Sequence, residues 1–515
     1  MRKNLLPSLV LTLVLLNACQ KASNETADAP VQKAVLIPSA DIDAFIMNQL
    51  KSNHHFEWKN ASDEMVWSAL LQSDKIMSIG YKPTGIANVE ENLANIDIEA
   101  NEWKNARQQV LQLIAKSESK TRPDVNIGTM EIWPEKVLPV IDVRIESFET
   151  VRLLRASGFV RYAEPMGYEP KNMQLNQRTQ SSSGCGNNVA EPTLLSGIDF
   201  IPIAPNTKQS WNYLYHGIPA AWAKSTGSGV KIFIIDTGSE DDQENLGTSF
   251  NQGSSSGRTF EKIVTLPRST FLGIPTGSIE KPDDGCGHGT SMAGACAAPR
   301  GTDGAACGVA YNCNLVTCRA AADVYLDESR EVKGAADAYT NAANRADVKI
   351  ISMSMGKMTS SSQLSDAIKY AYGKGKLMFC AAGTSYSWTA SWYGVIFPAY
   401  LNEVNAVTGV RDNNFNTNCT DCHQGNETDF TVVMEKAVNE RHPITLAMSG
   451  DAPSTVGGSS VSTATTAGMA ALIWSRFPTL TRDQVLNKMI VNSKNYPTRN
   501  SNLGWGNVNV DAATN

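Results

Sequence analysis

The feature that most constrains the fold is a series of short, uninterrupted apolar runs in the second half of the chain. Each run has the length of a β-strand, and stretches of helical pattern separate them. Runs without alternating polar residues suit strands that are buried on both faces, as in parallel sheets covered by helices. The runs are residues 230–235, 315–318, 348–353, 377–382 and 404–410. We therefore predict an α/β fold with a parallel sheet flanked by helices, whose chemistry lies at the carboxyl ends of the strands.

Three polar residues stand at positions where such elements begin or end. Asp236 closes the run 230–235, and the glycine two residues later permits a tight turn. His288 has a glycine on each side, and small residues after it lead into a helix. Ser460 opens a stretch made mostly of Gly, Ala, Ser and Thr, which would allow close burial of a helix while its hydroxyl stays at the helix mouth. Taken singly, the aspartate and the serine are better explained as turn or capping residues.

Taken together, in the order Asp236, His288 and Ser460, the three motifs resemble those of the subtilase family. That order differs from the chymotrypsin and α/β-hydrolase orders of the same three residue types. The resemblance extends over residues 211–513, and its further landmarks are residues 217–222, 308–310, 397–399 and 504–509.

The resemblance and the chemistry of these groups imply the same roles. Ser460 would attack a peptide carbonyl, His288 would take and return the proton, and Asp236 would hold the imidazole. We thus expect a serine endopeptidase that cleaves protein or peptide substrates through an acyl-enzyme. The resemblance also implies that an extended substrate pairs with the segment Ser352, Met353, Ser354, Met355 and Gly356.

The chain departs from the family pattern beside the nucleophile. Thr384 follows Ala-Ala-Gly where the family has an asparagine that donates to the oxyanion, so a weak oxyanion site of Thr384 and the Ser460 backbone N–H is expected. Ser459 stands where a threonine usually precedes the nucleophile, and Ala464 where a proline is common. These departures raise an alternative function, a catalytically weak or silent binding lipoprotein with the subtilase fold, although such a protein would not need all three triad residues.

The N-terminal part has the pattern of a small α+β domain. A helix is expected around residues 103–113, and Ile141, Val143 and Ile145 alternate with Asp142 and Arg144 as in a half-buried strand. A helix over residues 148–154 and a strand over 159–162 follow. Residues 138–165 resemble the end of a subtilisin propeptide, a ferredoxin-like chaperone and inhibitor.

These patterns divide the chain into a signal peptide (1–18), a tether (19–35), a propeptide-like α+β domain (36–170), a linker (171–205) and a subtilisin-like catalytic domain (206–515). The polar linker is a natural place for self-processing, which would release the catalytic domain.

The first residues predict export. Arg2 and Lys3 precede an apolar stretch that is too short for a mature membrane span and suits a signal peptide. That stretch runs into Leu16-Asn17-Ala18-Cys19, which resembles the bacterial lipobox, so Cys19 is the expected lipidation site. Gln20 then implies the outer membrane if the cell is Gram-negative. The alternative is an ordinary signal peptide in which the cysteine stands by chance.

Charge and cysteine content narrow the partners further. A net charge of −6 over 515 residues gives no basic footprint for nucleic acid. No cofactor is required; the acidic residues 241–245 leave calcium open, although a solvated loop explains them better. Nine cysteines remain after Cys19, and an odd number leaves at least one thiol free, for which Cys380 in a buried run is our candidate. Cys419, Cys422 and His423 match a haem-attachment motif, but a short disulfide or two thiols are expected instead.

Overall fold

The computed structural model describes residues 35–170, 185–186, 188–271, 274–384, 394–420 and 422–515. The predicted signal peptide, Cys19 and nearly all of the tether lie outside these residues, as does the Ser-rich first part of the predicted linker. From Val35 to Asn515 the chain forms one unit.

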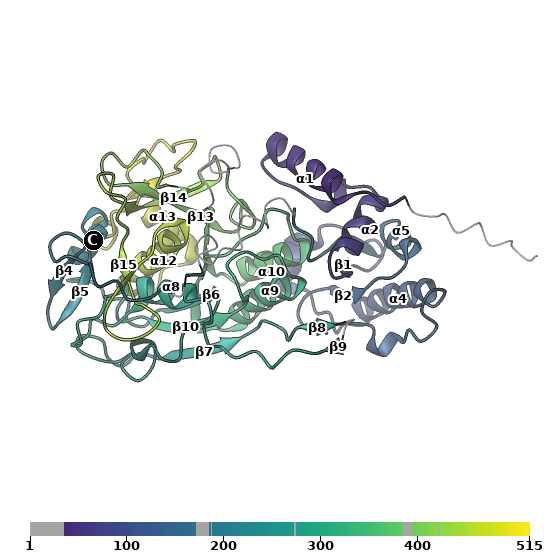
Figure 1. The fold of residues 1–515 in the computed structure, drawn as a ribbon, viewed down its shortest axis with the longest axis horizontal. Coiled ribbons are helices and arrows are strands. Elements are labelled where there is room, and N and C mark those ends of the chain that lie inside the picture. The colour runs from purple at the N-terminus through teal and green to yellow at the C-terminus, as the bar shows by residue number, and fades with distance from the viewer. Residues whose placement is uncertain (1–34, 171–184, 187, 272–273, 385–393, 421) are drawn as a thin grey trace, which may run out of the picture. The chain divides into compact units, whose positions relative to one another are not determined.

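A large sheet in the second half of the chain has eight strands, and every neighbouring pair in it is parallel (Figure 1). The spatial order is β17-β14-β13-β12-β11-β6-β10-β7. The strands are β6 (Lys231–Asp236), β7 (Phe260–Val264), β10 (Asn314–Arg319), β11 (Val348–Met353), β12 (Leu377–Ala381), β13 (Asn405–Arg411), β14 (Thr428–Glu435) and β17 (Gly506–Asn507). All five predicted runs are strands of this sheet, so the predicted α/β class is confirmed.

The register of the central strands decides where the chemistry lies. Ile235 of β6 is paired with Cys318 of β10 and with Met353 of β11, and Met353 is paired in turn with Cys380 of β12. Parallel strands in this register end at the same edge. The residues that follow β6, β11 and β12, starting with Asp236, therefore emerge side by side.

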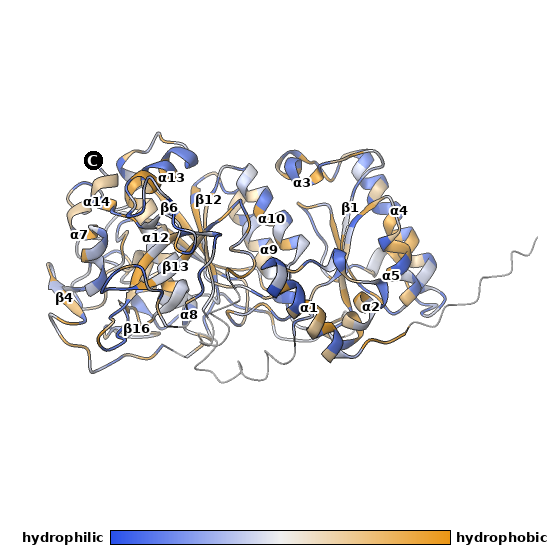
Figure 2. Ribbon diagram, turned by 90° about the horizontal axis from the view of Figure 1, so that it is seen from above, coloured by the Kyte–Doolittle hydropathy of each residue, from blue (hydrophilic) through white to orange (hydrophobic). Residues whose placement is uncertain are grey.

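Two pairs of helices cover the sheet. Helices α8 (His288–Ala297) and α12 (Gly458–Arg476) pack against each other and onto the central strands, and Figure 2 shows α9 (Ser329–Asn344) and α10 (Ser362–Gly373) on the other side. Small residues allow α8 and α12 to pack closely against each other. A Cβ at Gly468 of α12 would lie 3.3 Å from the carbonyl oxygen of Cys296 in α8 and 2.7 Å from the Cβ of Val309, which follows α8. The Gly, Ala, Ser and Thr content of α12 thus serves its burial, as predicted.

Smaller elements complete this part. Two antiparallel pairs of strands lie outside the large sheet. They are β4 (Phe200–Ile203) with β5 (Thr207–Ser210), and β15 (Ile444–Thr445) with β16 (Ser454–Thr455). Helices α13 (Arg482–Val491) and α14 (Val510–Ala513) end the chain, and α7 (Ile218–Ala221) packs against α14. Strands β8 (Thr270–Phe271) and β9 (Ile274–Pro275) form a further antiparallel pair.

The N-terminal part is α+β, as predicted. Its antiparallel sheet has the order β2-β1-β3, three strands among the described residues. The elements are α1 (Ser39–Asn53), α2 (Asp63–Gln72), β1 (Ile76–Tyr81), α3 (Val89–Asn92), α4 (Asn101–Glu118), β2 (Val140–Arg144), α5 (Phe148–Arg155) and β3 (Val160–Pro165).

The prediction that β2 is half-buried is wrong at Asp142, which is fully buried. The reason is a contact that the strand pattern cannot reveal: Gln363 of α10 donates to Asp142 across 2.9 Å, so the second face of this sheet is covered as well.

The structure contains two disulfides, Cys185–Cys286 and Cys419–Cys422. Because Cys419 and Cys422 are bonded to each other, they are not available to attach haem. Cys380 is a buried free thiol, as predicted, and four others are too: Cys296, Cys307, Cys313 and Cys318. In the part of the chain that is described, no helix has the length and apolar character needed to cross a membrane.

Candidate active site

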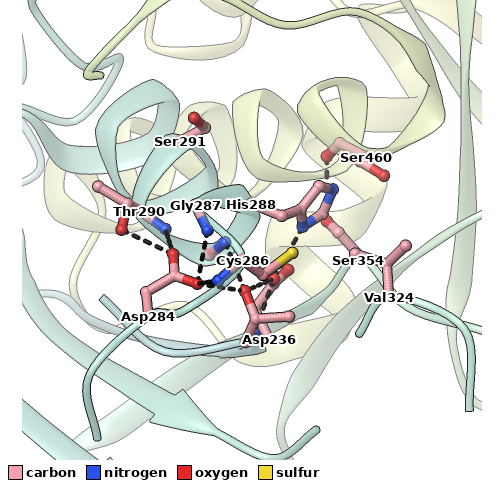
Figure 3. A network of polar contacts seen from close by, with 12 residues as sticks. Asp236, Asp284, Cys286, Gly287, His288, Thr290, Ser291, Val324, Ser354 and Ser460 are labelled. Atoms are coloured by element: carbon pink, nitrogen blue, oxygen red, sulfur yellow. Dashed lines mark hydrogen bonds and ion pairs between the residues drawn. The ribbon is translucent and has the colours of Figure 1, made fainter. Parts of the chain in front are cut away.

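The three residues singled out by the sequence come from three different elements. Asp236 is the last residue of β6, His288 is the first residue of α8, and Ser460 lies in the first turn of α12. Figure 3 shows them together, with the imidazole of His288 between Asp236 and Ser460. Asp236 and His288 are almost fully buried, whereas Ser460 is partly exposed. Substrate can therefore approach from the side of the serine.

Asp236 and His288 form a short, direct contact. The Nδ1 of His288 lies 2.7 Å from Oδ1 of Asp236, which also accepts a hydrogen bond from the N–H of Thr237. A carboxylate can only accept, so Nδ1 carries the proton and the neutral ring has Nε2 as its acceptor. Figure 3 shows this second nitrogen on the side of Ser460. The arrangement fixes the tautomer that a general base requires.

The charge balance at the imidazole favours its cation. Burial alone lowers the pKa of His288, but the Asp236 carboxylate, with smaller contributions from Asp284 and Asp323, outweighs burial and raises this pKa above its ordinary value. The Oδ2 atom of Asp236 is buried and has no hydrogen-bond partner among the described residues, so the donors to this carboxylate, His288 and Thr237, contact Oδ1. A proton taken up by His288 is thus stabilised where it arrives.

Asp284 supports the site, although the sequence pattern gave it no role. Its fully buried carboxylate accepts from the N–H groups of Cys286 and Gly287 and from the hydroxyl of Thr237 through Oδ1, at 2.8–3.0 Å. Its Oδ2 accepts from the N–H and hydroxyl of Thr290. Asp284 therefore holds the turn before His288 and the residue after Asp236 in one network. The sequence signal was present, since an Asp before a Gly-rich turn commonly accepts from the backbone that follows it.

Thr384 lies beside the start of α12 and is already engaged there. Its Oγ1 accepts from the N–H of Ser459 at 3.0 Å and lies 2.9 Å from the Ser459 hydroxyl. The Ser459 hydroxyl also accepts from the N–H of Gly383. A Cβ at Gly458 would come within 2.8 Å of Thr384 Oγ1, so this backbone approaches the threonine as closely as glycine allows. Thr384 acts here as a cap of α12, next to the nucleophile.

The predicted substrate segment splits into two parts. Ser352 and Met353 lie within the buried strand β11. Ser354 and Met355 follow it, and the Ser354 hydroxyl donates to the carbonyl of Ser460 at 3.0 Å. The backbone of Gly356 already pairs with residues 324–326, through its N–H to Val324 and its carbonyl to Leu326.

Calcium binding by residues 241–245 stays a prediction, since calcium also takes backbone carbonyl and amide oxygens as ligands. The Asp241 carboxylate forms an ion pair with Lys262 at 2.9 Å. Across the described stretches of the chain, no three His, Cys, Asp or Glu side chains gather as metal ligands. We assign no catalytic step to a metal.

Several known proteins are similar in sequence to this chain. Subtilisin DY of Bacillus licheniformis is 29% identical over 287 residues, which cover 56% of this chain and 91% of that protein. Thermitase of Thermoactinomyces vulgaris is 29% identical over 197 residues, 38% of this chain and 60% of thermitase.

Among solved structures, MycP1 from the ESX-1 type VII secretion system has a TM-score of 0.47 and 21% identity, with 63% of this chain and 89% of that chain covered. The Subtilase family model matches residues 227–506, more than half of the chain. The chain therefore belongs to the subtilase family and is a subtilisin-like serine endopeptidase.

Proposed function

We propose that Asp236, His288 and Ser460 are the catalytic triad of this endopeptidase. His288 Nε2 takes the proton of the Ser460 hydroxyl as its oxygen attacks the substrate carbonyl, and the imidazolium then gives that proton to the leaving amine. Water hydrolyses the acyl-enzyme by the same route. The observation that carries this proposal is the 2.7 Å contact between Asp236 and His288, which leaves Nε2 on the side of Ser460.

The oxyanion site of this proposal is asymmetric. The N–H of Ser460, at the start of the long helix α12, is the principal donor, since helix N-termini favour negative charge. Thr384 is a weaker second donor, because its hydroxyl shares its hydrogen-bonding capacity with Ser459. This predicts a functional but slow enzyme.

An extended substrate would run along the segment after β11. Ser354 and Met355 follow the strand and precede the pairing of Gly356 with Val324 and Leu326. Backbone pairing at this place gives affinity with little dependence on substrate sequence. Ser352 and Met353 support the segment from within the sheet, where they are buried.

We further propose that residues 36–170 act as a propeptide-like inhibitor. Glu164 accepts from the N–H and hydroxyl of Ser362 at the start of α10, and Arg161 pairs with Asp366 on the same helix at 2.5 Å. Glu169 accepts from the Tyr325 hydroxyl and the N–H of Met358. Glu169 thereby ties the end of this part to Tyr325 and to the segment after β11, along which substrate would run.

The proposal also covers lipidation of the exported chain and its cleavage in the linker. After export, Cys19 would carry the lipid anchor, in the outer membrane of a Gram-negative cell, and a cut between Tyr168 and Trp211 would detach the catalytic domain from it. The support is the leader of residues 1–18, the lipobox-like residues 16–19 and the polar linker. Conversion of Cys19 to serine should abolish incorporation of labelled fatty acid and should leave hydrolysis by the processed domain unchanged.

The triad is tested by single and combined variants. Ser460→Ala, His288→Ala and Asp236→Ala should each nearly abolish cleavage of an unfolded protein substrate, and the double variants should lose little more, because the residues act as one unit. In the Ser460→Ala chain the N-terminal part should stay attached, whereas wild type yields a fragment that begins in the linker. Retained hydrolysis in Ser460→Ala would overturn the assignment. Absent hydrolysis in wild type, with a bound peptide, would favour the silent binding lipoprotein.

A further inference from the structure

Part of the predicted linker contacts the surroundings of the candidate active site. Three of its residues, Cys185, Asn188 and Glu191, contact the segments that carry His288 and Ser460, and we call these three residues the strap. All three precede residues 227–506, which match the family model. Cys185 contributes a disulfide, Asn188 the hydrogen bonds of its amide, and Glu191 a hydrogen bond to its carboxylate.

Cys185 fixes one end of the strap to the turn before His288. It forms a disulfide with Cys286, across 101 residues of sequence. The Cys185 sulfur lies 3.5 Å from a carboxylate oxygen of Asp323, one of the groups that raise the pKa of His288. Figure 3 shows the Cys286 side chain next to Asp236 and His288. The strap thus begins at its disulfide to Cys286, which lies two residues before His288 in the sequence.

Asn188 holds the chain on both sides of His288. Its side-chain amide donates to the carbonyl of Gly287 and to the hydroxyl of Ser291, each at 2.8 Å. Gly287 immediately precedes the histidine in a left-handed conformation, with φ of +83°, and it caps α8 without a side-chain hydrogen bond of its own. Ser291 lies one turn later. One rigid amide group therefore fixes the spacing of the turn that carries His288.

The rest of the strap connects this turn to the segment that leads to Ser460. The carbonyl of Asn188 accepts from the N–H of Met448 at 3.1 Å. Glu191 donates its N–H to the carbonyl of Pro453, and its carboxylate accepts from the hydroxyl of Thr455 at 2.7 Å. Thr455 belongs to β16, shortly before α12. The strap therefore spans the elements of the general base and the nucleophile.

We propose that Asn188 is a positioning residue for His288 and that the strap is part of the catalytic machinery of this protease. This inference rests on the proposed triad. Asn188 is not expected to touch substrate; it acts by holding the Gly287 carbonyl and the Ser291 hydroxyl, and Asp284 holds the same turn from its other side. Small displacements of a general base reduce proton transfer steeply. A processed protease should therefore keep Cys185, which places the productive cut before that residue.

The test compares Asn188→Asp and Asn188→Ala with a matched control. Aspartate keeps the shape but cannot donate, so both variants should lower kcat by about 10- to 100-fold with KM nearly unchanged. Amide hydrogen exchange in residues 286–294 should become faster in both. Asn206→Ala, which removes a similar asparagine contact to a backbone carbonyl at Thr302, should change neither quantity. If the Asn188 variants do not fold, Ser291→Ala removes one of the two acceptors and should give a smaller fall in kcat.

Two results would overturn the inference: wild-type kcat in the Asn188 variants, or unchanged exchange in residues 286–294. A rise in KM with unchanged kcat would also contradict it, because that would assign Asn188 to substrate binding. Failure of the proposed triad is recognised separately, by hydrolysis that survives in Ser460→Ala. The exchange measurement needs no activity and still decides the positioning role in that case.

Discussion

Thr384 offers a sharp test of how the oxyanion is stabilised. Its Oγ1 accepts from the N–H of Ser459 and shares a second hydrogen bond with the Ser459 hydroxyl, at 3.0 and 2.9 Å. Thr384→Val keeps the shape of the side chain and removes both bonds. The buried N–H of Ser459 then lacks its acceptor, which should lower the free energy of unfolding by about 1–3 kcal/mol.

The effect on catalysis should be smaller than that of losing a dedicated oxyanion donor. Such a donor contributes about 10²–10³ in kcat, a magnitude measured in a subtilisin and borrowed here. A hydroxyl that is shared with Ser459 should contribute only about 1 kcal/mol, or roughly 5- to 10-fold in kcat. Thr384→Ser, which keeps the hydroxyl, is the control and should resemble wild type in both quantities.

The assay combines urea unfolding followed by fluorescence with steady-state hydrolysis of a chromogenic peptide, on all three proteins. A kcat loss of about 10²–10³ in Thr384→Val, with unchanged stability, would refute this reasoning, because it would make Thr384 a dedicated donor instead of a cap.

Three further outcomes are expected. Because nearby carboxylates raise the pKa of His288, kcat/KM should rise with pH through a midpoint above about 6.5. Asp323→Asn should move that midpoint to lower pH, and an unchanged midpoint would contradict the assigned cause of the shift. Burial raises the pKa of Glu164 to about 7, so binding of the cleaved N-terminal part should be strongest in acid and weaken as pH rises through about 7. Gel filtration at several pH values measures this, and Glu164→Gln should reduce the dependence without abolishing it, because burial also raises the pKa of Asp142, which Gln363 of α10 covers, to about 7. Asp284→Asn, which turns an acceptor of several N–H groups partly into a donor, should lower the free energy of unfolding by about 1–3 kcal/mol and also lower kcat; wild-type values in denaturant titration and kinetics would show that its network is dispensable.

The sequence was sufficient for the sheet and for singling out three residues that the fold brings together, because both depend on local patterns. Apolar runs without alternation predicted five strands of the large sheet. Gly289, beside His288, marks the close approach of the Gly238 backbone, and the small residues after Ser460 mark the close packing of α12. These signals are contained in a few neighbouring residues, so a single sequence can reveal them.

Features that depend on distant contacts were not predictable in this way. Asp142 looked like the exposed residue of a strand, but Gln363, more than two hundred residues later, covers it. The Cys185–Cys286 pairing and the bonds of Asn188 likewise join the linker to the turn before His288. No periodicity encodes such pairs, since they arise only when the sheet brings separate segments to one edge.

The most direct test of the account is to locate the adduct of a fluorophosphonate probe by mass spectrometry of the processed protein. We predict a single adduct on Ser460, formed at a rate that falls sharply in His288→Ala and follows the pH dependence of kcat/KM. An adduct on another serine, or hydrolysis of protein substrate by a chain whose Ser460 remains unmodified, would contradict the assignment of Ser460 as the nucleophile.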